Sequence, residues 1–420
     1  MFVPVLICTS LTYQTTNCMN IDLLIAYLSH KITDDLFLIG LYQCLLSSLV
    51  ACFVAVVAIP VVIKISEIKS LMEKPGERRA HTTPTPTFGG IAIFAAVLVS
   101  YFLWPSLEQA DTYRTNLSIV GMTILFFVGI KDDLVGVDPS KKIFFQVLPA
   151  LILIFFGDLK VDYLYGILGF THIEEAISVV LTCFIFIALT NAINLIDGID
   201  GLAGGIATIA SVSFGSWFLI TDHFAMALMA FSLAGALAGF LRFNFSHTSK
   251  IFMGDTGSLI LGFMLSFFAV RFVNLNSSFR FEPTAFFNAP IIAIVILIVP
   301  IFDTLRVFLV RIMGKRSPFS ADRNHMHHIL LDNGLSHAQA TGVLCGASLL
   351  NTITFILFHH NISNTASLLI LIALFMVYML AGFLLKMRAT YVSTHPFRRR
   401  AVIRREFQNA LAGRRLIEYL

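Results

Sequence analysis

Eleven apolar runs constrain what this chain can fold into, because each is long enough, or nearly so, to cross a lipid bilayer as a helix. Hydrophobic residues make up 57% of the chain and charged residues 13%, whereas a soluble domain carries about 25% charged residues. The sequence therefore predicts an all-α polytopic membrane protein with about 11 transmembrane helices. The runs are residues 36–63, 88–104, 117–130, 143–157, 174–193, 202–220, 223–241, 256–275, 285–310, 338–358 and 365–385.

The distribution of Lys and Arg between alternate loops predicts the orientation of these helices. Loops on one side hold 23 of the 29 Lys and Arg residues, loops on the other side hold 4, and the last two, Arg271 and Arg306, lie within runs. Because basic residues accumulate in cytoplasmic loops, we expect the N-terminus outside and the C-terminus in the cytoplasm. Asp303 and Arg306, three residues apart, are interpreted as a structural ion pair.

The runs follow one another without an internal repeat, which indicates a single transmembrane domain over residues 36–390. Residues 1–35 precede it as a segment outside the membrane, to which the sequence assigns no role. Residues 391–420 follow it as a basic cytoplasmic tail, and its arginines at 398–400 are expected to meet lipid head groups.

Five polar motifs fall in five different loops, and all five loops lie on the predicted cytoplasmic side. Motifs that are far apart in the sequence but share one side of a membrane can converge on one cleft, so this coincidence is the strongest functional indication in the sequence. The motifs are K-P-G-E-R-R-A-H…P-T-P-T-F-G-G (74–90), K-D-D (131–133), N-A-I-N-L-I-D-G-I-D-G (191–201), F-M-G-D-T-G-S (252–258) and D-R-N-H-M-H-H (322–328).

Carboxylates in two of these motifs are candidate cation ligands. Asp132 and Asp133 directly follow the third run, where adjacent carboxylates are costly unless a cation or another partner compensates them; a solvated helix end is the alternative. Asp255 precedes the eighth run, where it is also a good helix N-cap. Carboxylates with few other protein ligands suit Mg²⁺, which keeps several waters and takes phosphate oxygens.

The motif at 191–201 combines two aspartates with two asparagines in an apolar context. Asp197 and Asp200 stand three residues apart, which would place both on one face of one helical turn, with Asn191 and Asn194 on the same side one turn earlier. Glycines after both aspartates permit close approach of a ligand. An N-cap before residue 202 would explain one aspartate but not four polar residues, so we favour a binding site.

Three histidines in four residues, His325, His327 and His328, stand beside Arg323. Histidine pairs occur in zinc sites, but no cysteine accompanies them here, and the carboxylates of the other loops suit a harder cation. We therefore interpret the histidines as groups that hydrogen-bond phosphate or transfer protons.

Together the five motifs resemble those of the polyprenyl-phosphate N-acetylhexosamine-1-phosphate transferases, in the same order along residues 36–390. The H-x-H-H form is similar to the N-acetylglucosamine branch, whereas the muramoyl-pentapeptide branch has three consecutive histidines where Met326 interrupts the run here. The resemblance implies a Mg²⁺-dependent enzyme, with Mn²⁺ as the alternative cation. Its reaction would convert UDP-N-acetylglucosamine and undecaprenyl phosphate into undecaprenyl-diphospho-N-acetylglucosamine and UMP.

The resemblance also implies the setting of this reaction. The enzyme would lie in the bacterial inner membrane, contact membrane lipids but no nucleic acid, and initiate a cell-surface glycan such as the O antigen of lipopolysaccharide or a cell-wall polymer. A homodimer is left open.

Roles for individual residues follow from the same resemblance. The metal ligands would be Asp255 and Asp132. The catalytic groups would be Asp132, Asp133, Asp197, Asp200, His325, His327 and His328. The substrate-binding groups would be Asn191, Asn194, Phe252 stacked on uracil, Gly254, Arg323 and Thr87, with Gly89 and Gly90 lining the cleft.

The chemistry implied in this way needs little base catalysis. A phosphate monoester has a second pKa of about 6 and is mostly dianionic at neutral pH, so we expect direct in-line attack by the lipid phosphate, with Asp132 orienting it or taking a residual proton. A covalent intermediate on an aspartate is the alternative mechanism. The alternative functions are the same transfer from another UDP-hexosamine or UDP-muramoyl-pentapeptide and, in a different class, a secondary transporter.

Overall fold

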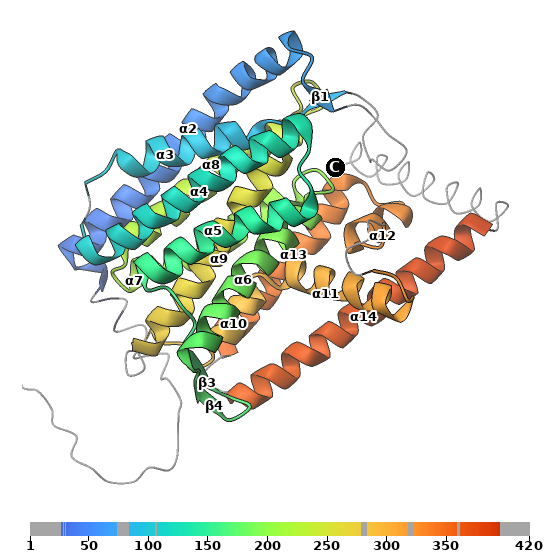
Figure 1. Ribbon diagram of the computed structural model, residues 1–420. Helices are drawn as coiled ribbons and strands as arrows, with labels where there is room; N and C mark the ends of the chain where they lie inside the picture. The colour runs from blue at the N-terminus through green and yellow to red at the C-terminus, as the bar shows by residue number, and fades with distance from the viewer. Residues whose placement is uncertain are drawn as a thin grey trace, which may run out of the picture.

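Long helices dominate the computed structural model, which describes residues 27, 29, 31–73, 84–105, 107–278, 284–317, 323–358 and 362–394 (Figure 1). The helices are α2 (Asp35–Ile68), α3 (Gly89–Phe102), α4 (Gln109–Val135), α5 (Pro139–Gly157), α6 (Glu175–Ile196), α7 (Leu202–Ile220), α8 (Phe224–Asn244), α9 (Gly254–Ser278), α10 (Ala289–Ile296), α11 (Ile298–Met313), α12 (Met326–Asp332), α13 (His337–Phe358) and α14 (Asn364–Thr394). Most of the predicted segment 1–35 and most of the tail 391–420 lie outside the described residues, as do residues 74–83 and Asp322 of two motifs.

Each of the eleven predicted runs coincides with a helix or with the pair α10 and α11. Within the described residues, eight helices are long and apolar enough to cross a membrane, or nine if the bent pair α10–α11 forms one span. The chain is therefore an all-α, multi-pass membrane protein, as predicted. The number of eleven crossings stays a prediction, because α3 is short and α4 begins with polar residues. The orientation of the helices also stays a prediction.

The run at 285–310 was expected to form one helix, but the chain bends by 81° between α10 and α11. Pro300 lies in the first turn of α11, where it has no N–H to donate and its ring would clash with the carbonyl four residues earlier. That carbonyl belongs to Ile296, the last residue of α10. The proline therefore accounts for the break, and α11 leaves the direction of the bundle.

Helix α4 is longer than the run 117–130 that predicted it, and its polar first turns are compensated by buried partners. Asp111 is 1% exposed and accepts hydrogen bonds from His223 and from Arg271, the latter at 2.6 Å. At its other end α4 extends to Val135, so Asp132 and Asp133 lie in its last turn rather than in a loop.

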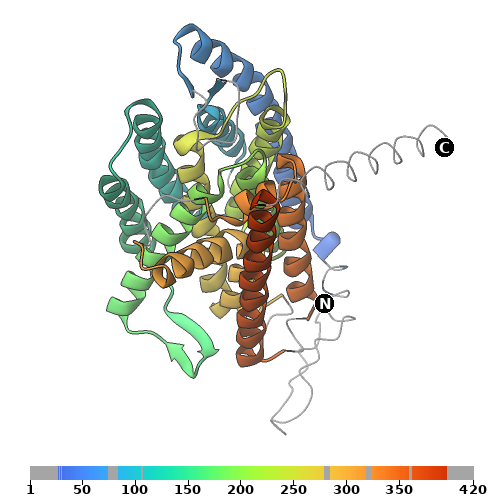
Figure 2. The same ribbon diagram turned by 90° about the vertical axis from the view of Figure 1, so that its right-hand side faces the viewer.

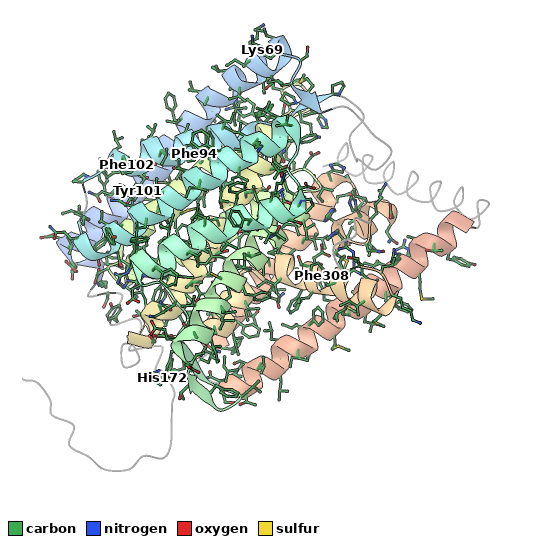
Figure 3. All side chains as sticks on the ribbon, viewed as in Figure 1. Lys69, Phe94, Tyr101, Phe102, His172 and Phe308 are labelled. Atoms are coloured by element: carbon green, nitrogen blue, oxygen red, sulfur yellow. The ribbon has the colours of Figure 1, made fainter. Side chains whose placement is uncertain are left out.

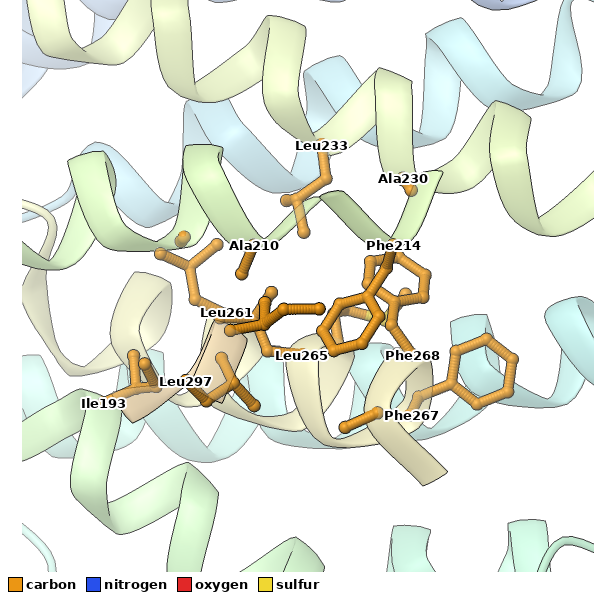
Figure 4. Packing of buried hydrophobic residues seen from close by; sticks show 14 of the residues in the cluster. Ile193, Ala210, Phe214, Ala230, Leu233, Leu261, Leu265, Phe267, Phe268 and Leu297 are labelled. Atoms are coloured by element: carbon orange, nitrogen blue, oxygen red, sulfur yellow. The ribbon is translucent and has the colours of Figure 1, made fainter. Parts of the chain in front are cut away.

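The centre of the bundle is formed by α8 and α9, which are almost entirely buried. Phenylalanine and leucine side chains of α9 interdigitate with α7 and α8, as Figure 4 shows for Phe268, Phe214 and Leu233. Small residues bring backbones together, since Gly235 and Gly239 of α8 leave no room for a side chain against α2. Close approach at small residues is the usual basis of helix packing in lipid.

The outer faces of the bundle carry exposed apolar side chains, as expected of helices that face lipid (Figure 3). Two small antiparallel sheets mark its two ends. Strands β1 (Met72–Glu73) and β2 (Thr85–Pro86) pair at one end, close to Lys69, and β3 (Tyr163–Ile167) and β4 (Phe170–His172) form a hairpin at the other (Figures 1 and 3). Figure 2 shows this hairpin beside the start of α14.

Candidate active site

The amino-terminal end of α9 is the centre around which the motifs gather. The carboxylate of Asp133, in the last turn of α4, accepts hydrogen bonds from the backbone N of Asp255 at 2.8 Å and of Thr256 at 3.0 Å, and from Thr256 Oγ1 at 2.6 Å. A helix leaves its first N–H groups unsatisfied, and its positive end favours a carboxylate. Asp133 therefore caps α9 from a neighbouring helix.

Lys142, in the first turns of α5, bridges the two carboxylates that were predicted to hold a metal. Its Nζ lies 2.8 Å from Asp132 Oδ2 and 2.6 Å from Asp255 Oδ1. The Nδ2 of Asn194 donates to the same oxygen of Asp255 and, at 2.8 Å, to Ser258 Oγ. The two carboxylates thus face one point, where positive charge compensates them.

The glycine-containing segment of the first motif lies against the fourth motif. The backbone N of Gly89 donates to the carbonyl of Phe252, and that of Gly90 donates to the carbonyl of Met253, both at 2.9 Å. A Cβ at Gly90 would collide with the backbone at Gly257. These contacts seat α3 directly on the start of α9.

Gly254 occupies a position that only glycine fits. Its φ of +73° is in the left-handed region, which L-residues with a Cβ disfavour. An added Cβ would also overlap the carbonyl oxygen of Thr87 and the carboxylate of Asp133. Thr87 and Gly254, both expected at the site, therefore meet beside the cap of α9.

Asp197 and Asp200 were expected on one face of a helical turn, and this expectation is wrong. Helix α6 ends at Ile196 and α7 begins at Leu202, so both aspartates lie on the turn between them. Regular helical geometry stops at Asp197, whose ψ is 44°, and Gly201, with a φ of +78°, is the N-cap of α7. Asp197 is the C-cap of α6.

Asp200 joins this turn to two other segments. Its Oδ2 accepts hydrogen bonds from Lys250 Nζ at 2.6 Å and His337 Nδ1 at 2.8 Å. Burial alone would raise the pKa of Asp200, but the hydrogen bonds from His337 and Lys250 hold that pKa below its ordinary value. Lys250 Nζ also lies over the ring of Phe252, 5.3 Å from its centroid, so the ring expected to stack on uracil is close to a fixed positive charge.

Asn191 is one turn from the centre of the site. Its Nδ2 donates to Gln146 Oε1 at 2.6 Å and to the carbonyl of Ile187 at 2.7 Å. These bonds link α5 to α6, and the substrate contact expected of Asn191 stays a prediction.

The three histidines differ in their surroundings. His325 Nδ1 lies 2.8 Å from Asp303 Oδ2 in the interior. His327 is 1% exposed, and among the described residues neither of its ring nitrogens has a hydrogen-bond partner. The rings of His325 and His327 stack with centroids 5.6 Å apart, and His328 follows at 4.3 Å from His327.

Burial keeps two of these histidines neutral. Burial lowers the pKa of His327 to about 3, and the neighbouring His328 acts in the same direction. Burial also lowers the pKa of His328 to about 4, with Arg323 adding to the effect. Arg323 itself is about half exposed, and its guanidinium lies 3.6 Å from Asp332, the last residue of α12.

Several residues of the site were not predicted. Three of them lie outside every motif and reach the site only through folding. Lys142 meets Asp132 and Asp255. Lys250 and His337 both meet Asp200. Asp303 did carry a signal, because an ionisable residue inside an apolar run is a functional-site hypothesis by default. The predicted ion pair with Arg306 exists at 4.0 Å, but the bonds of Asp303 to the histidine loop are shorter.

The donor set around Lys142 fits a hard cation. It consists of carboxylate oxygens of Asp132 and Asp255, with Ser258 Oγ close by, and Mg²⁺ prefers oxygen ligands with several retained waters. A compact triad of Glu108, Asp111 and His223 also has the spacing of metal ligands. It lies near the opposite end of α9, however, where the guanidinium of Arg271 already compensates Asp111.

A cluster of carboxylates, amides and buried histidines at one end of an apolar helical bundle defines a class of protein: a multi-pass membrane enzyme that handles a charged substrate beside lipid. Comparisons with known proteins then identify the family. Residues 116–273 match the family described as glycosyl transferase family 4.

Several curated relatives are similar to this chain over most of their length. The decaprenyl-phosphate N-acetylglucosaminephosphotransferase of Mycobacterium tuberculosis strain H37Rv is 32% identical over 64% of this chain and 71% of that protein. The probable undecaprenyl-phosphate N-acetylglucosaminyl 1-phosphate transferase of Bacillus subtilis strain 168 is 30% identical over 70% and 79%, respectively. The undecaprenyl-phosphate alpha-N-acetylglucosaminyl 1-phosphate transferase of Escherichia coli O157:H7 is 26% identical over 75% and 84%.

The chain belongs to the family of polyprenyl-phosphate N-acetylglucosamine phosphotransferases, and it is an enzyme of the phosphotransferase class. The resemblance that the motifs indicated is thereby confirmed.

Proposed function

We propose that the chain transfers N-acetylglucosamine 1-phosphate from UDP-N-acetylglucosamine to undecaprenyl phosphate, giving undecaprenyl-diphospho-N-acetylglucosamine and UMP. The observation that carries the proposal is the convergence of Asp132, Asp133 and Asp255 with Asn194 around one cation-compensated point. The names of the relatives support the polyprenyl phosphate acceptor and the amino sugar. The uridine diphosphate donor and the glycan that the product initiates are our inference from the motifs.

We propose that Mg²⁺ binds at Asp132 and Asp255, with Lys142 moving aside or sharing the charge. Such a cation supplies a Lewis acid that neutralises the diphosphate and the departing UMP. Two residues would position this cation site. Asn194 orients the carboxylate of Asp255 through its amide, and Asp133 holds the start of α9 in place.

The hydrogen bonds of the aspartates favour direct attack by the lipid phosphate over a covalent aspartyl intermediate. Both carboxylate oxygens of Asp133 accept bonds from α9. Oδ1 of Asp132 accepts a bond from the backbone N of Val137 at 2.8 Å, and its Oδ2 faces the proposed cation position, which Lys142 now occupies. Oxygens that are occupied in this way are poor nucleophiles. Mass spectrometry of enzyme incubated with donor but without lipid acceptor tests this, since sugar phosphate attached to either aspartate would contradict direct attack.

An apolar cavity of about 400 Å³ between α6, α9, α10 and α11 is a suitable site for the first isoprene units of the acceptor. Ile185, Val273 and Leu297 are among its lining residues, and Thr304 is the one polar side chain among them. Ala192 and Thr304 also line it, and they adjoin Asn191 and Asp303 in the sequence. We infer that this end of the cavity lies close to the polar site, which would let a lipid phosphate reach the site while its tail stays among apolar groups.

We infer that the pocket faces the cytoplasm of a bacterium, where UDP-sugars are made. Lys131, Lys141, Lys142 and Lys250 all lie at the pocket end of the helices, in agreement with the accumulation of basic residues in cytoplasmic loops. Cysteine labelling from either side of intact spheroplasts at Lys141, after substitution by Cys, tests this orientation.

The decisive assay offers purified protein a panel of donors with undecaprenyl phosphate and Mg²⁺. UDP-N-acetylglucosamine should give UMP and the lipid diphosphate sugar, whereas UDP-N-acetylgalactosamine and UDP-muramoyl-pentapeptide should give little. Omitting the lipid acceptor, adding EDTA, or substituting Asp255→Asn should each abolish UMP release. Absence of UMP with every donor, together with flux of a solute into vesicles, would instead support a transporter.

A further inference from the structure

Asp303 is a buried carboxylate that binds the histidine loop at two points. It is 1% exposed, and the ring of His325 beside it is 5% exposed. Its Oδ2 accepts from His325 Nδ1 at 2.8 Å, and its Oδ1 accepts from the backbone N of Met326 at 2.7 Å. The sequence suggested a structural pair with Arg306, but these contacts place the carboxylate directly behind an imidazole of the site.

Charged and polar groups of α11 itself and of α14 surround this carboxylate. The hydroxyl of Tyr378 on α14 donates to Asp303 Oδ1 at 3.3 Å. Arg306 lies 4.0 Å from the same oxygen and donates to the carbonyl of Asn324, whose side chain accepts from Lys386 of α14. The loop before α12 is therefore fixed from α11 and α14 together.

The chemical consequence differs for the three histidines. An ionised carboxylate only accepts hydrogen bonds, so His325 must carry its proton on Nδ1, and Nε2 is left for another partner. Among the described residues, no carboxylate contacts a ring nitrogen of His327 or His328 in the same way.

We propose that Asp303 is a positioning residue for the transfer reaction, which fixes the ring of His325 with Nδ1 toward the carboxylate and so presents Nε2 to the phosphate groups of the substrates. No bond to His325 is made or broken in this role. His327 and His328 then act as neutral hydrogen-bonding groups. The inference rests on the proposed function, because it assigns a role within the same pocket.

The test compares a variant of Asp303 itself with a variant of Tyr378, which donates a hydrogen bond to Asp303. Asp303→Asn removes the charge behind His325, whereas Tyr378→Phe removes only the bond to Oδ1. In the UMP-release assay, Asp303→Asn should lower kcat by about 10²-fold with the KM for UDP-N-acetylglucosamine changed by less than about threefold. Tyr378→Phe should keep kcat within about threefold of the wild type.

A double variant and a second substitution separate positioning from folding. If Asp303 acts through His325, adding Asp303→Asn to His325→Gln should lower kcat by less than about twofold more. His325→Asn keeps a donor for Asp303 but removes Nε2, so it should fold with the wild-type melting temperature and lose as much kcat as Asp303→Asn. Additive losses, or an active His325→Asn, would overturn the inference. An inactive wild-type protein would instead contradict the proposed function.

Discussion

The imidazole of His327 rests directly against Gly198, so that a methyl group at this glycine would overlap Nε2 of the ring. Gly198 belongs to the turn between α6 and α7, and His327 belongs to α12, 129 positions further along the chain. The contact is therefore the point at which the third and fifth motifs meet, and the glycine is there because the ring needs its space.

Gly198→Ala should displace the ring of His327 and lower activity by at least about tenfold, because a shift of about 1 Å in a catalytic group can cost much of the rate. The measurement is kcat for UMP release, with circular dichroism to show that the helices persist. Gly342→Ala is the matched control, since a Cβ at Gly342 on α13 meets no other atom within 4 Å. Equal activity of both variants would contradict the contact.

Asp133 is expected to be important for folding as well as for activity. Asp133→Asn leaves only one acceptor oxygen for the three donors at the start of α9, which should cost about 1–3 kcal/mol and lower the melting temperature by a few degrees. Asp138→Asn is the control, because Asp138 is exposed and its side chain caps no backbone N–H. If both variants melt like the wild type, the capping role of Asp133 is wrong.

Lys142 occupies the place between Asp132 and Asp255, so its removal should strengthen cation binding. Lys142→Met leaves two carboxylates without their ammonium partner, and their repulsion should raise the affinity for Mn²⁺ several-fold in electron paramagnetic resonance titrations. Lys141→Met, at the exposed neighbouring position, should bind Mn²⁺ like the wild type, and Asp255→Asn should bind it more weakly. Weaker binding by Lys142→Met would show that the cation site lies elsewhere.

Much of the bundle could be predicted because lipid imposes a simple rule on the sequence: backbone groups must bond within each helix, so long apolar runs become helices. What could not be predicted depended on partners in other elements. The early start of α4 requires Arg271 and His223 to meet Asp111, and the direction that α11 takes after the break depends on the helices against which it packs.

The site shows the same division. Its motifs were visible because carboxylates, amides and histidines are rare in apolar surroundings. The pairing of Asp133 with the start of α9, and of Asp200 with His337, depends on how distant segments pack. The three-residue spacing of Asp197 and Asp200 suggested that both lie on one helical turn. The glycines at 198 and 201 were interpreted as allowing close approach of a ligand, but glycine permits the end of a helix equally well.

The pH dependence of stability should be dominated at its acidic side by the buried histidines. In the folded protein the pKa of His327 is about 3 because of burial, whereas in the unfolded chain it is about 6.5. The unfolded state therefore binds the proton first, and stability is lost as pH falls from about 6.5 towards 3. His327→Gln should flatten the fall in melting temperature between pH 7 and 5, while the same change at the exposed His247 should not. Parallel curves for both variants would contradict this assignment.

Thr304 is expected to contribute to binding of the lipid acceptor and not to binding of the nucleotide sugar. Its hydroxyl lines the apolar cavity and makes no hydrogen bond within the described residues. An unpaired buried hydroxyl costs about 1–3 kcal/mol, so a phosphate oxygen arriving at the end of the cavity would be a favourable partner. Thr304→Val keeps the shape, and it should raise the KM for undecaprenyl phosphate several-fold while leaving the KM for UDP-N-acetylglucosamine unchanged. Thr354→Val, on an exposed face of α13, should change neither constant. An altered KM for the nucleotide sugar would instead place Thr304 on the donor side of the pocket, and the cavity would then not be the path of the lipid.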